Sequence, residues 1–136
     1  MALRGEDLIG ISINGNRRRI LKGESKSGIS ITASTIAKAR KALKSYKGRP
    51  SPHSMTFVMK RLFEMGKDDL AIIFEECVAD NSIPPRDLVH LLFTLTGNDP
   101  SAALSDDLTA YTGKVEQHSV NVRILDHQRF ISSIYP

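Results

Sequence analysis

Cysteine, tryptophan and long apolar runs are scarce in this sequence, and each shortage excludes a class of protein. Cys77 is the only cysteine, so a fold held by internal disulfides is excluded and a reducing compartment is expected. No apolar run approaches the roughly 18 residues that a helix needs to cross a bilayer. Acids occupy the N-terminal region where a secretory signal would be basic. We therefore expect a cytoplasmic protein, with the nucleus as a second location.

Signatures of catalysis and metal binding are also missing. The four histidines stand far apart, without the spacing of metal ligands: His53, His90, His118 and His127. No glycine-rich phosphate loop occurs. The stretch around Pro84 and Pro85 could be taken for a calcium loop, but it lacks the glutamate that would complete one. The sequence therefore predicts no catalytic residue, no metal site, no cofactor and no enzymatic activity.

Charge is divided unevenly along the chain. Residues 1–67 contain 15 Lys and Arg against 4 Asp and Glu, whereas residues 68–136 contain 4 against 11. The net charge of +4 therefore combines one half at +11 with another at −7. Such asymmetry indicates either binding of a polyanion or contact between complementary patches.

A β-hairpin is predicted at the N-terminus. Isoleucines recur at every second position of residues 8–13, which places them on one face of a strand. Asn14 and Gly15 favour a tight turn, and residues 16–21 would form the return strand. The polar residues 22–28 are expected to form a loop, followed by a short extended stretch at residues 29–31.

Five helices are expected between residues 32 and 112, because apolar residues recur there at intervals of three and four. Their expected ranges are 35–46, 55–63, 70–78, 86–96 and 100–111. The fourth is apolar on nearly every side, so we expect it to be the central, most buried helix. Pro84 and Pro85 suit its first turn, and His90 within it is expected to be buried and hydrogen-bonded.

A strand is predicted near the C-terminus, where Val120, Val122 and Ile124 alternate with polar residues. Its expected partner is the N-terminal hairpin, because a lone strand leaves backbone groups unpaired. The predicted fold class is α+β and predominantly helical, with a compact five-helix core and this small sheet. We expect one domain, residues 1–136, made of a hairpin region (1–31), a helical core (32–112) and a C-terminal strand and tail (118–136).

A basic cluster is the strongest functional signal. It places 11 Lys and Arg within 33 residues, opposed only by Glu24. Its members are Arg17, Arg18, Arg19, Lys22, Lys26, Lys38, Arg40, Lys41, Lys44, Lys47 and Arg49. Because such side chains bind phosphates through counterion release, we expect a non-enzymatic protein that binds RNA or DNA backbone with weak sequence specificity. A viral source is one expectation, and the acidic second half would support a homo-oligomer.

Other interpretations stay open. In one, the protein is a helical adaptor whose basic half binds an acidic partner or an anionic membrane surface. The apolar tail, with Phe130, Ile131, Ile134 and Tyr135, would then contact a protein partner. In another, the helix at residues 35–46 reads DNA as part of a helix-turn-helix, although that motif needs a helix before it and residues 1–30 look extended.

Overall fold

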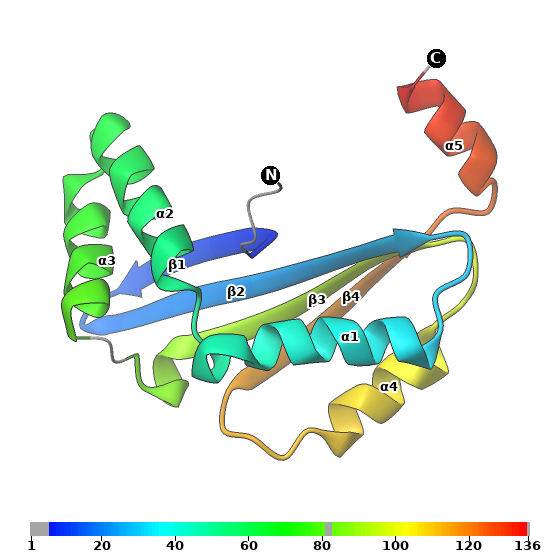
Figure 1. Cartoon of the computed structure of the whole chain (residues 1–136), viewed down its shortest axis with the longest axis horizontal. Coiled ribbons are helices and arrows are strands. Elements are labelled where there is room, and N and C mark those ends of the chain that lie inside the picture. The colour runs from blue at the N-terminus through cyan, green and yellow to red at the C-terminus, as the bar shows by residue number, and fades with distance from the viewer. Residues whose placement is uncertain (1–5, 81–82, 136) are drawn as a thin grey trace.

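A four-stranded mixed sheet forms the centre of the molecule in the computed structural model, which describes residues 6–80 and 83–135 (Figure 1). Strand β1 (Leu8–Asn14) is antiparallel to β2 (Arg17–Gly28). Strand β3 (Leu88–Thr96) is parallel to both β2 and β4 (Glu116–Arg123). The strand order is β1-β2-β3-β4, so β3 lies inside the sheet and β1 and β4 form its edges.

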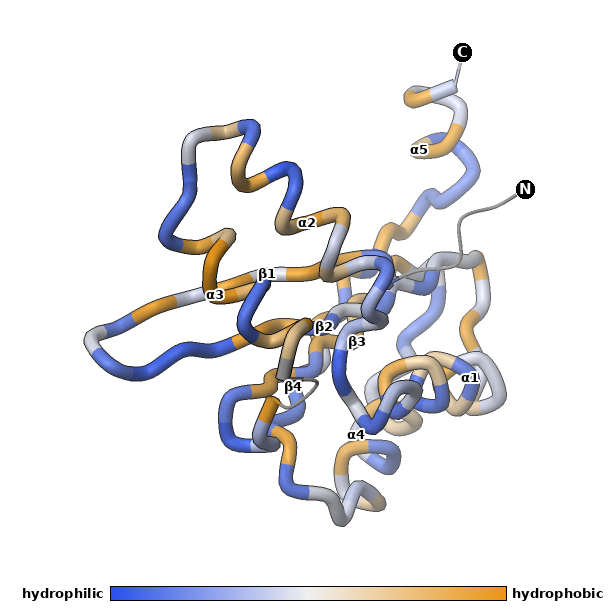
Figure 2. The backbone as a smooth tube through the Cα atoms, turned by 60° about the vertical axis from the view of Figure 1, so that its left-hand side comes forward, coloured by the Kyte–Doolittle hydropathy of each residue, from blue (hydrophilic) through white to orange (hydrophobic). Residues whose placement is uncertain are grey.

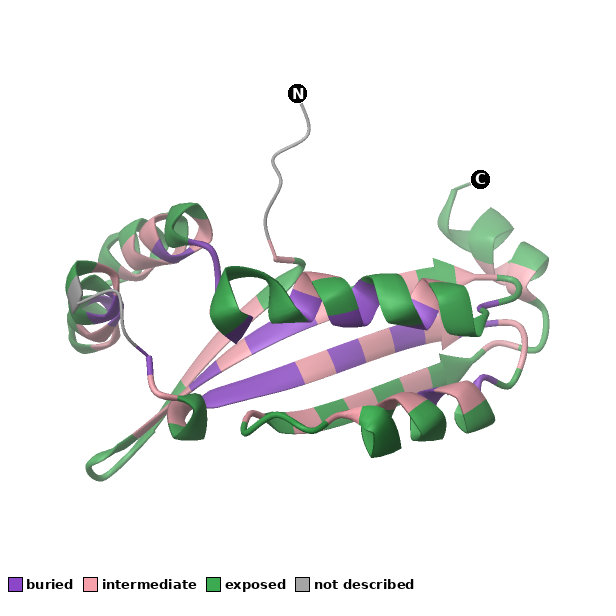
Figure 3. Ribbon diagram, turned by 60° about the horizontal axis from the view of Figure 1, so that its bottom comes forward, coloured by how far each residue is buried: buried purple, intermediate pink, exposed green. Residues whose placement is uncertain are grey.

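Helices connect the parallel strands. The α-helices are α1 (Ala33–Lys44), α2 (Pro52–Glu64), α3 (Asp68–Asp80), α4 (Ser101–Ala110) and α5 (His127–Ile134). Two 3-10 turns, η1 (Ser45–Gly48) and η2 (Pro85–Asp87), flank them. Helices α1 and α4 lie together along one face of the sheet, and α2 and α3 form a pair at the hairpin end (Figures 1 and 3). Helix α5 extends from the end of β4, away from the sheet.

The predicted hairpin is confirmed, with a different turn and a longer second strand. Asn14 pairs with Arg17, so Gly15 and Asn16 are the central residues of the turn. Gly15 has a φ of 62°, a conformation that glycine adopts at little cost. The loop predicted at residues 22–28 is wrong, because β2 continues to Gly28. Its backbone groups pair with β3, a partner that lies about 70 residues away and leaves no mark on the local sequence.

The fourth predicted helix is also wrong, because most of it is strand β3. Residues 88–96 form a nearly unbroken apolar run, and such a run is compatible with either a buried helix or a strand inside a sheet. The even-numbered side chains of β3 are buried, and the odd-numbered ones are mostly half-buried (Figure 3). The prediction that this is the central segment is nevertheless confirmed. Pro84 and Pro85 begin only the short turn η2.

The predicted fold class is corrected by these two findings. The chain is a mixed α/β protein, not a predominantly helical one with a small sheet. The C-terminal strand β4 pairs with β3, not with the hairpin, because β3 lies between the two. The five-helix core between residues 32 and 112 is therefore replaced by four α-helices around the inner strand.

The core consists of two apolar clusters on the helix-covered side of the sheet. The cluster at the hairpin end contains Ile20, Met55, Phe74, Cys77, Ile83 and Leu88. The cluster beneath α1 and α4 contains Ile31, Ile36, Ala39, Leu43, Leu92 and Leu104. Cys77 is thus a small core side chain. Helices α1, α2 and α3 each contribute an apolar face to this core, as the spacing of their apolar residues in the sequence indicated.

Replacing Leu92 by Ala should reduce the free energy of unfolding by about 2–5 kcal/mol, because its side chain is fully buried beneath α1. Leu91 is the matched control: it is half-buried and its side chain points to the opposite face of the sheet. Leu91→Ala should reduce the free energy of unfolding by a distinctly smaller amount. Urea titration of both variants measures the difference, and equal losses would contradict the inward position of Leu92.

Candidate nucleic-acid interface

The eleven residues of the basic cluster do not form one surface. Side chains alternate along β2, so Arg19 lies on the face of the sheet opposite to α1, whereas Arg18 and Lys22 lie on the side of α1. Arg17 is exposed beside the hairpin turn, which projects from the sheet as a hydrophilic end (Figure 2). The basic residues of the hairpin are therefore divided between the two faces of the sheet, and only some of them lie on the side of the basic helix.

Five members of the cluster have ion pairs with carboxylates, and one of them, Lys22 with Glu6, is described below. The other four pairs are Arg18–Asp87 at 3.3 Å, Lys26–Glu24 at 3.0 Å, Arg40–Asp107 at 2.7 Å, and Arg19–Glu116. Most of these carboxylates come from the acidic second half of the sequence. The opposite charges of the two halves are thus partly matched within one chain, without a second copy.

Arg40 belongs to a buried polar network. Besides Asp107, its guanidinium donates to the side-chain oxygen of Gln117. The amide of Gln117 donates to Nδ1 of His90 at 3.0 Å, and Nε2 of His90 lies 2.7 Å from the carbonyl oxygen of Gly48. Because a carbonyl only accepts, Nε2 carries the hydrogen and the imidazole is neutral. The prediction of a buried, hydrogen-bonded His90 is confirmed.

Lys22 is also a structural residue. Its side chain is buried on β2, and its ammonium group donates to the carbonyl oxygens of Ser45 and Arg49, each at 2.9 Å. The carboxylate of Glu6 lies 3.8 Å away. These contacts tie β2 to both ends of η1. Lys22 and Arg40 are therefore removed from the surface that a nucleic acid could reach.

Burial changes the acid–base properties of these groups. It lowers the pKa of Lys22, and the nearby carboxylate of Glu6 only partly opposes this effect. Burial also lowers the pKa of His90 below its usual 6.5, against the hydrogen bond to Gly48. For Glu6, burial raises the pKa, but hydrogen bonds from Ser54 and Ser51 outweigh burial and the net pKa is lowered. Glu6 therefore stays ionised beside the ammonium group.

Four exposed lysines remain, and we call them the lysine row: Lys38, Lys41, Lys44 and Lys47. The first three follow one another at intervals of three on α1, and the fourth lies in η1. None has an ion pair within the described ranges 6–80 and 83–135. Lys41 and Lys44 also lie in the last turn of α1, where the helix dipole favours positive charge.

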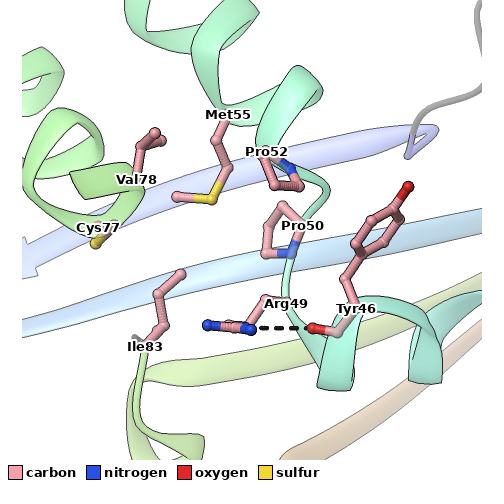
Figure 4. A pocket seen from close by; sticks show the side chains of 8 residues that line it. All are labelled: Tyr46, Arg49, Pro50, Pro52, Met55, Cys77, Val78 and Ile83. Atoms are coloured by element: carbon pink, nitrogen blue, oxygen red, sulfur yellow. Dashed lines mark hydrogen bonds between the residues drawn. The ribbon is translucent and has the colours of Figure 1, made fainter. Parts of the chain in front are cut away.

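A small pocket opens beside η1 (Figure 4). It is lined by Tyr46, Arg49, Pro50, Pro52, Met55, Cys77, Val78 and Ile83. Its volume of about 50 Å³ holds one or two waters and is too small for a nucleobase. Arg49 is half-buried at its edge and donates through Nε to the carbonyl oxygen of Tyr46 at 3.2 Å.

The partners of Lys22 and Arg40 were missed by the sequence analysis. Glu6, Asp107 and Gln117 lie far from them along the chain, and no motif marks them. Among the residues that the structure describes, no group of three or more His, Cys, Asp or Glu could hold a metal ion. In that same part of the chain, every helix is too short or too polar to cross a membrane.

The sheet, its crossover helices and the lysine row define a small mixed α/β protein with an exposed basic helix. The chain belongs to the HamA family, because the family model described as HamA matches residues 1–135. No curated protein matches the chain.

Stability should decrease as the pH falls from 7 to 5, through His90. In the unfolded chain this histidine takes up a proton near pH 6.5, but in the folded chain only at a lower pH. The unfolded state therefore binds more protons in this window, and the free energy of unfolding falls as pH decreases. The loss reaches at most about 1.4 kcal/mol per pH unit. Urea titrations at pH 7, 6 and 5 measure this slope.

Two variants isolate the contribution of His90. His90→Gln removes the titrating group and should flatten the dependence on pH. His53→Gln, at an exposed position of α2, should leave the slope as it is in the unaltered protein. If His90→Gln kept the full slope, the assignment to His90 would be wrong.

Proposed function

We propose that this chain binds the phosphate backbone of RNA or DNA through the lysine row. One observation carries the proposal: all four lysines are exposed, and neither α1 nor η1 contains an acidic residue. Lysine ammonium groups on such a surface bind phosphates and release the counterions condensed on them.

The spacing of the row suits a linear polyanion. Lys38, Lys41 and Lys44 recur at intervals of three, so neighbouring side chains differ in direction by only about 60° and lie on one strip of the helix. The strip extends over roughly 9 Å along the axis, and Lys47 follows three residues later in η1. Several consecutive phosphates of one strand are therefore within reach of a single face.

The proposed interface is smaller than the eleven-residue cluster. Lys22 and Arg40 are buried, and Arg18, Arg19 and Lys26 are held by carboxylates. Contacts to phosphates fix the position of a protein on nucleic acid without reading its bases. We therefore propose that the protein binds nucleic acid with little preference for the base sequence.

Binding to a DNA duplex should weaken roughly 100-fold between 50 and 200 mM salt, as expected for about four phosphate contacts. The double variant Lys41→Glu/Lys44→Glu should bind much more weakly and should reduce the salt slope by about two. Fluorescence anisotropy with labelled duplex and single-stranded probes measures both quantities.

The matched control is Lys60→Glu/Lys67→Glu, which makes the same change of charge at exposed positions of α2 and of the turn after it. It should retain most of the affinity. Equal weakening by the two double variants would indicate a general effect of net charge and would contradict an interface at the lysine row. Absence of binding at 50 mM salt would contradict the proposed function itself.

The same samples test the proposal that the protein is not an enzyme. The probes are incubated with and without Mg²⁺ and examined by gel electrophoresis for length. Intact probes are expected. Shortened probes would contradict a purely binding role, and Glu24, the carboxylate between Lys22 and Lys26 on β2, would be the first residue to replace by Gln.

A second candidate function is favoured by helix α5. It is amphipathic, and Ile131, Ile134 and Tyr135 remain exposed on one side of it. Leu125, in the link from β4, is 87% exposed. Exposed apolar side chains gathered on one helix indicate a protein contact. We propose that α5 binds a protein partner, with a second copy of the chain as the first partner to test.

Self-association through α5 predicts a dimer whose formation depends on protein concentration in analytical ultracentrifugation. Ile131→Asp/Ile134→Asp should convert it to a monomer, because it places charges on the apolar side of the helix. Ser132→Asp/Ser133→Asp adds the same charge to neighbouring exposed positions outside the apolar stripe and should leave the dimer intact. A protein that is monomeric at every concentration would contradict the second copy as partner.

A further inference from the structure

The turn η1 has an unusual backbone. Tyr46 (φ 55°, ψ 36°) and Lys47 (φ 57°, ψ 35°) both adopt the left-handed conformation, and Gly48 follows with a φ of 81°. Residues with a Cβ atom are strained in this region. They are the only two non-glycine residues with positive φ in the described ranges 6–80 and 83–135. Strained backbone of this kind gathers at functional sites.

Two buried side chains hold the turn in place. Lys22 on β2 donates to the carbonyl oxygens that precede and follow the strained residues, those of Ser45 and Arg49. His90 on β3 donates to the carbonyl oxygen of Gly48. These hydrogen bonds from the sheet therefore stabilise the left-handed conformation of Tyr46 and Lys47, which is unfavourable for the turn alone.

The consequence is an aromatic ring that stays in solvent. The Tyr46 side chain is 58% exposed, and it extends away from the chain while Arg49 points to the other side (Figure 4). Tyr46 lines the adjacent pocket together with Met55 and Ile83, but its ring points away from these two side chains (Figure 4). Burial thus does not account for a tyrosine at this position.

The surroundings of the ring are positively charged. Lys44 and Lys47, the last two members of the lysine row, flank Tyr46 in sequence and are exposed. The ammonium group of Lys22 lies 5.9 Å from the centre of the ring. An exposed aromatic ring beside exposed lysines is an arrangement by which proteins bind unpaired bases, because every base has a face that can stack.

We propose that Tyr46 stacks on an unpaired base of a nucleic-acid strand bound to the lysine row, so that the protein prefers single strands to duplexes. This inference rests on the proposed function and adds the class of ligand to it. In a duplex the base faces already stack on each other, so only an unpaired base presents a face to Tyr46.

The test compares three probes of equal length: a thymidine oligonucleotide, the same backbone without bases, and a duplex. Tyr46→Gly should weaken binding of the oligonucleotide about 10-fold, as expected for loss of one stacked base. Binding of the probe without bases and of the duplex should change less than about two-fold, because the phosphate contacts remain. Tyr46→Phe should bind as the unaltered protein does.

Tyr46→Gly is also designed to keep the fold, because glycine adopts the left-handed conformation without strain. Its melting temperature should equal or exceed that of the unaltered protein. Tyr46→Leu keeps an apolar side chain of similar length without an aromatic face, and it should lose affinity for the oligonucleotide as Tyr46→Gly does.

A spectroscopic measurement gives an independent readout. The sequence contains no tryptophan, so Tyr46→Trp introduces a single indole at the turn. Stacking predicts that its fluorescence is quenched by the oligonucleotide but not by the probe without bases.

Three results would overturn the inference. The first is unchanged affinity of Tyr46→Gly for the oligonucleotide, and the second is an equal loss of affinity for the probe without bases. In either case the protein still binds through the lysine row, and only the role of Tyr46 fails. The third is that the unaltered protein binds none of the probes, which overturns the proposed function and the stacking role together.

Discussion

The pairing of β3 with a parallel strand on each side is the constraint on which the rest of the structure depends. Parallel neighbours cannot be joined by a tight turn, so the chain must cross back over the sheet between them. Helix α1 and the α2–α3 pair lie in the first crossover, and α4 lies in the second. These helices cover the face that carries Leu92 and His90. The position of the basic helix over the sheet follows from that topology.

Burial divides the positive charges into structural and exposed groups. Lys22 and Arg40 satisfy backbone carbonyls and carboxylates in the interior, where an unpaired partner would be costly. The lysines on the outer side of α1 have no such partners within residues 6–80 and 83–135, so their charge faces the solvent. The same residue type thus stabilises the fold at one position and is available for a ligand at another. The net charge of the basic half does not distinguish these roles.

The left-handed turn connects the core to the proposed interface. Two non-glycine residues in this conformation cost roughly 1–2 kcal/mol each. The hydrogen bonds from Lys22 and His90 offset this cost, because they satisfy carbonyl groups that the turn directs into the interior. A change at either buried residue would therefore alter the surface where Tyr46 and Lys47 lie. The conformation of the candidate site therefore depends on side chains of the core.

The sequence by itself determined the local features: the N-terminal hairpin, the apolar faces of α1, α2 and α3, the buried His90 and the basic outer face of α1. Each depends on neighbours a few residues apart, and periodicity and turn chemistry report such neighbours directly. Only the tertiary structure decided that residues 88–96 form an inner strand and that β2 continues to Gly28, because their partners are distant in the chain. It also decided which charges are buried. Glu6 and Asp107 come close to Lys22 and Arg40 only when the sheet brings the two ends of the sequence together.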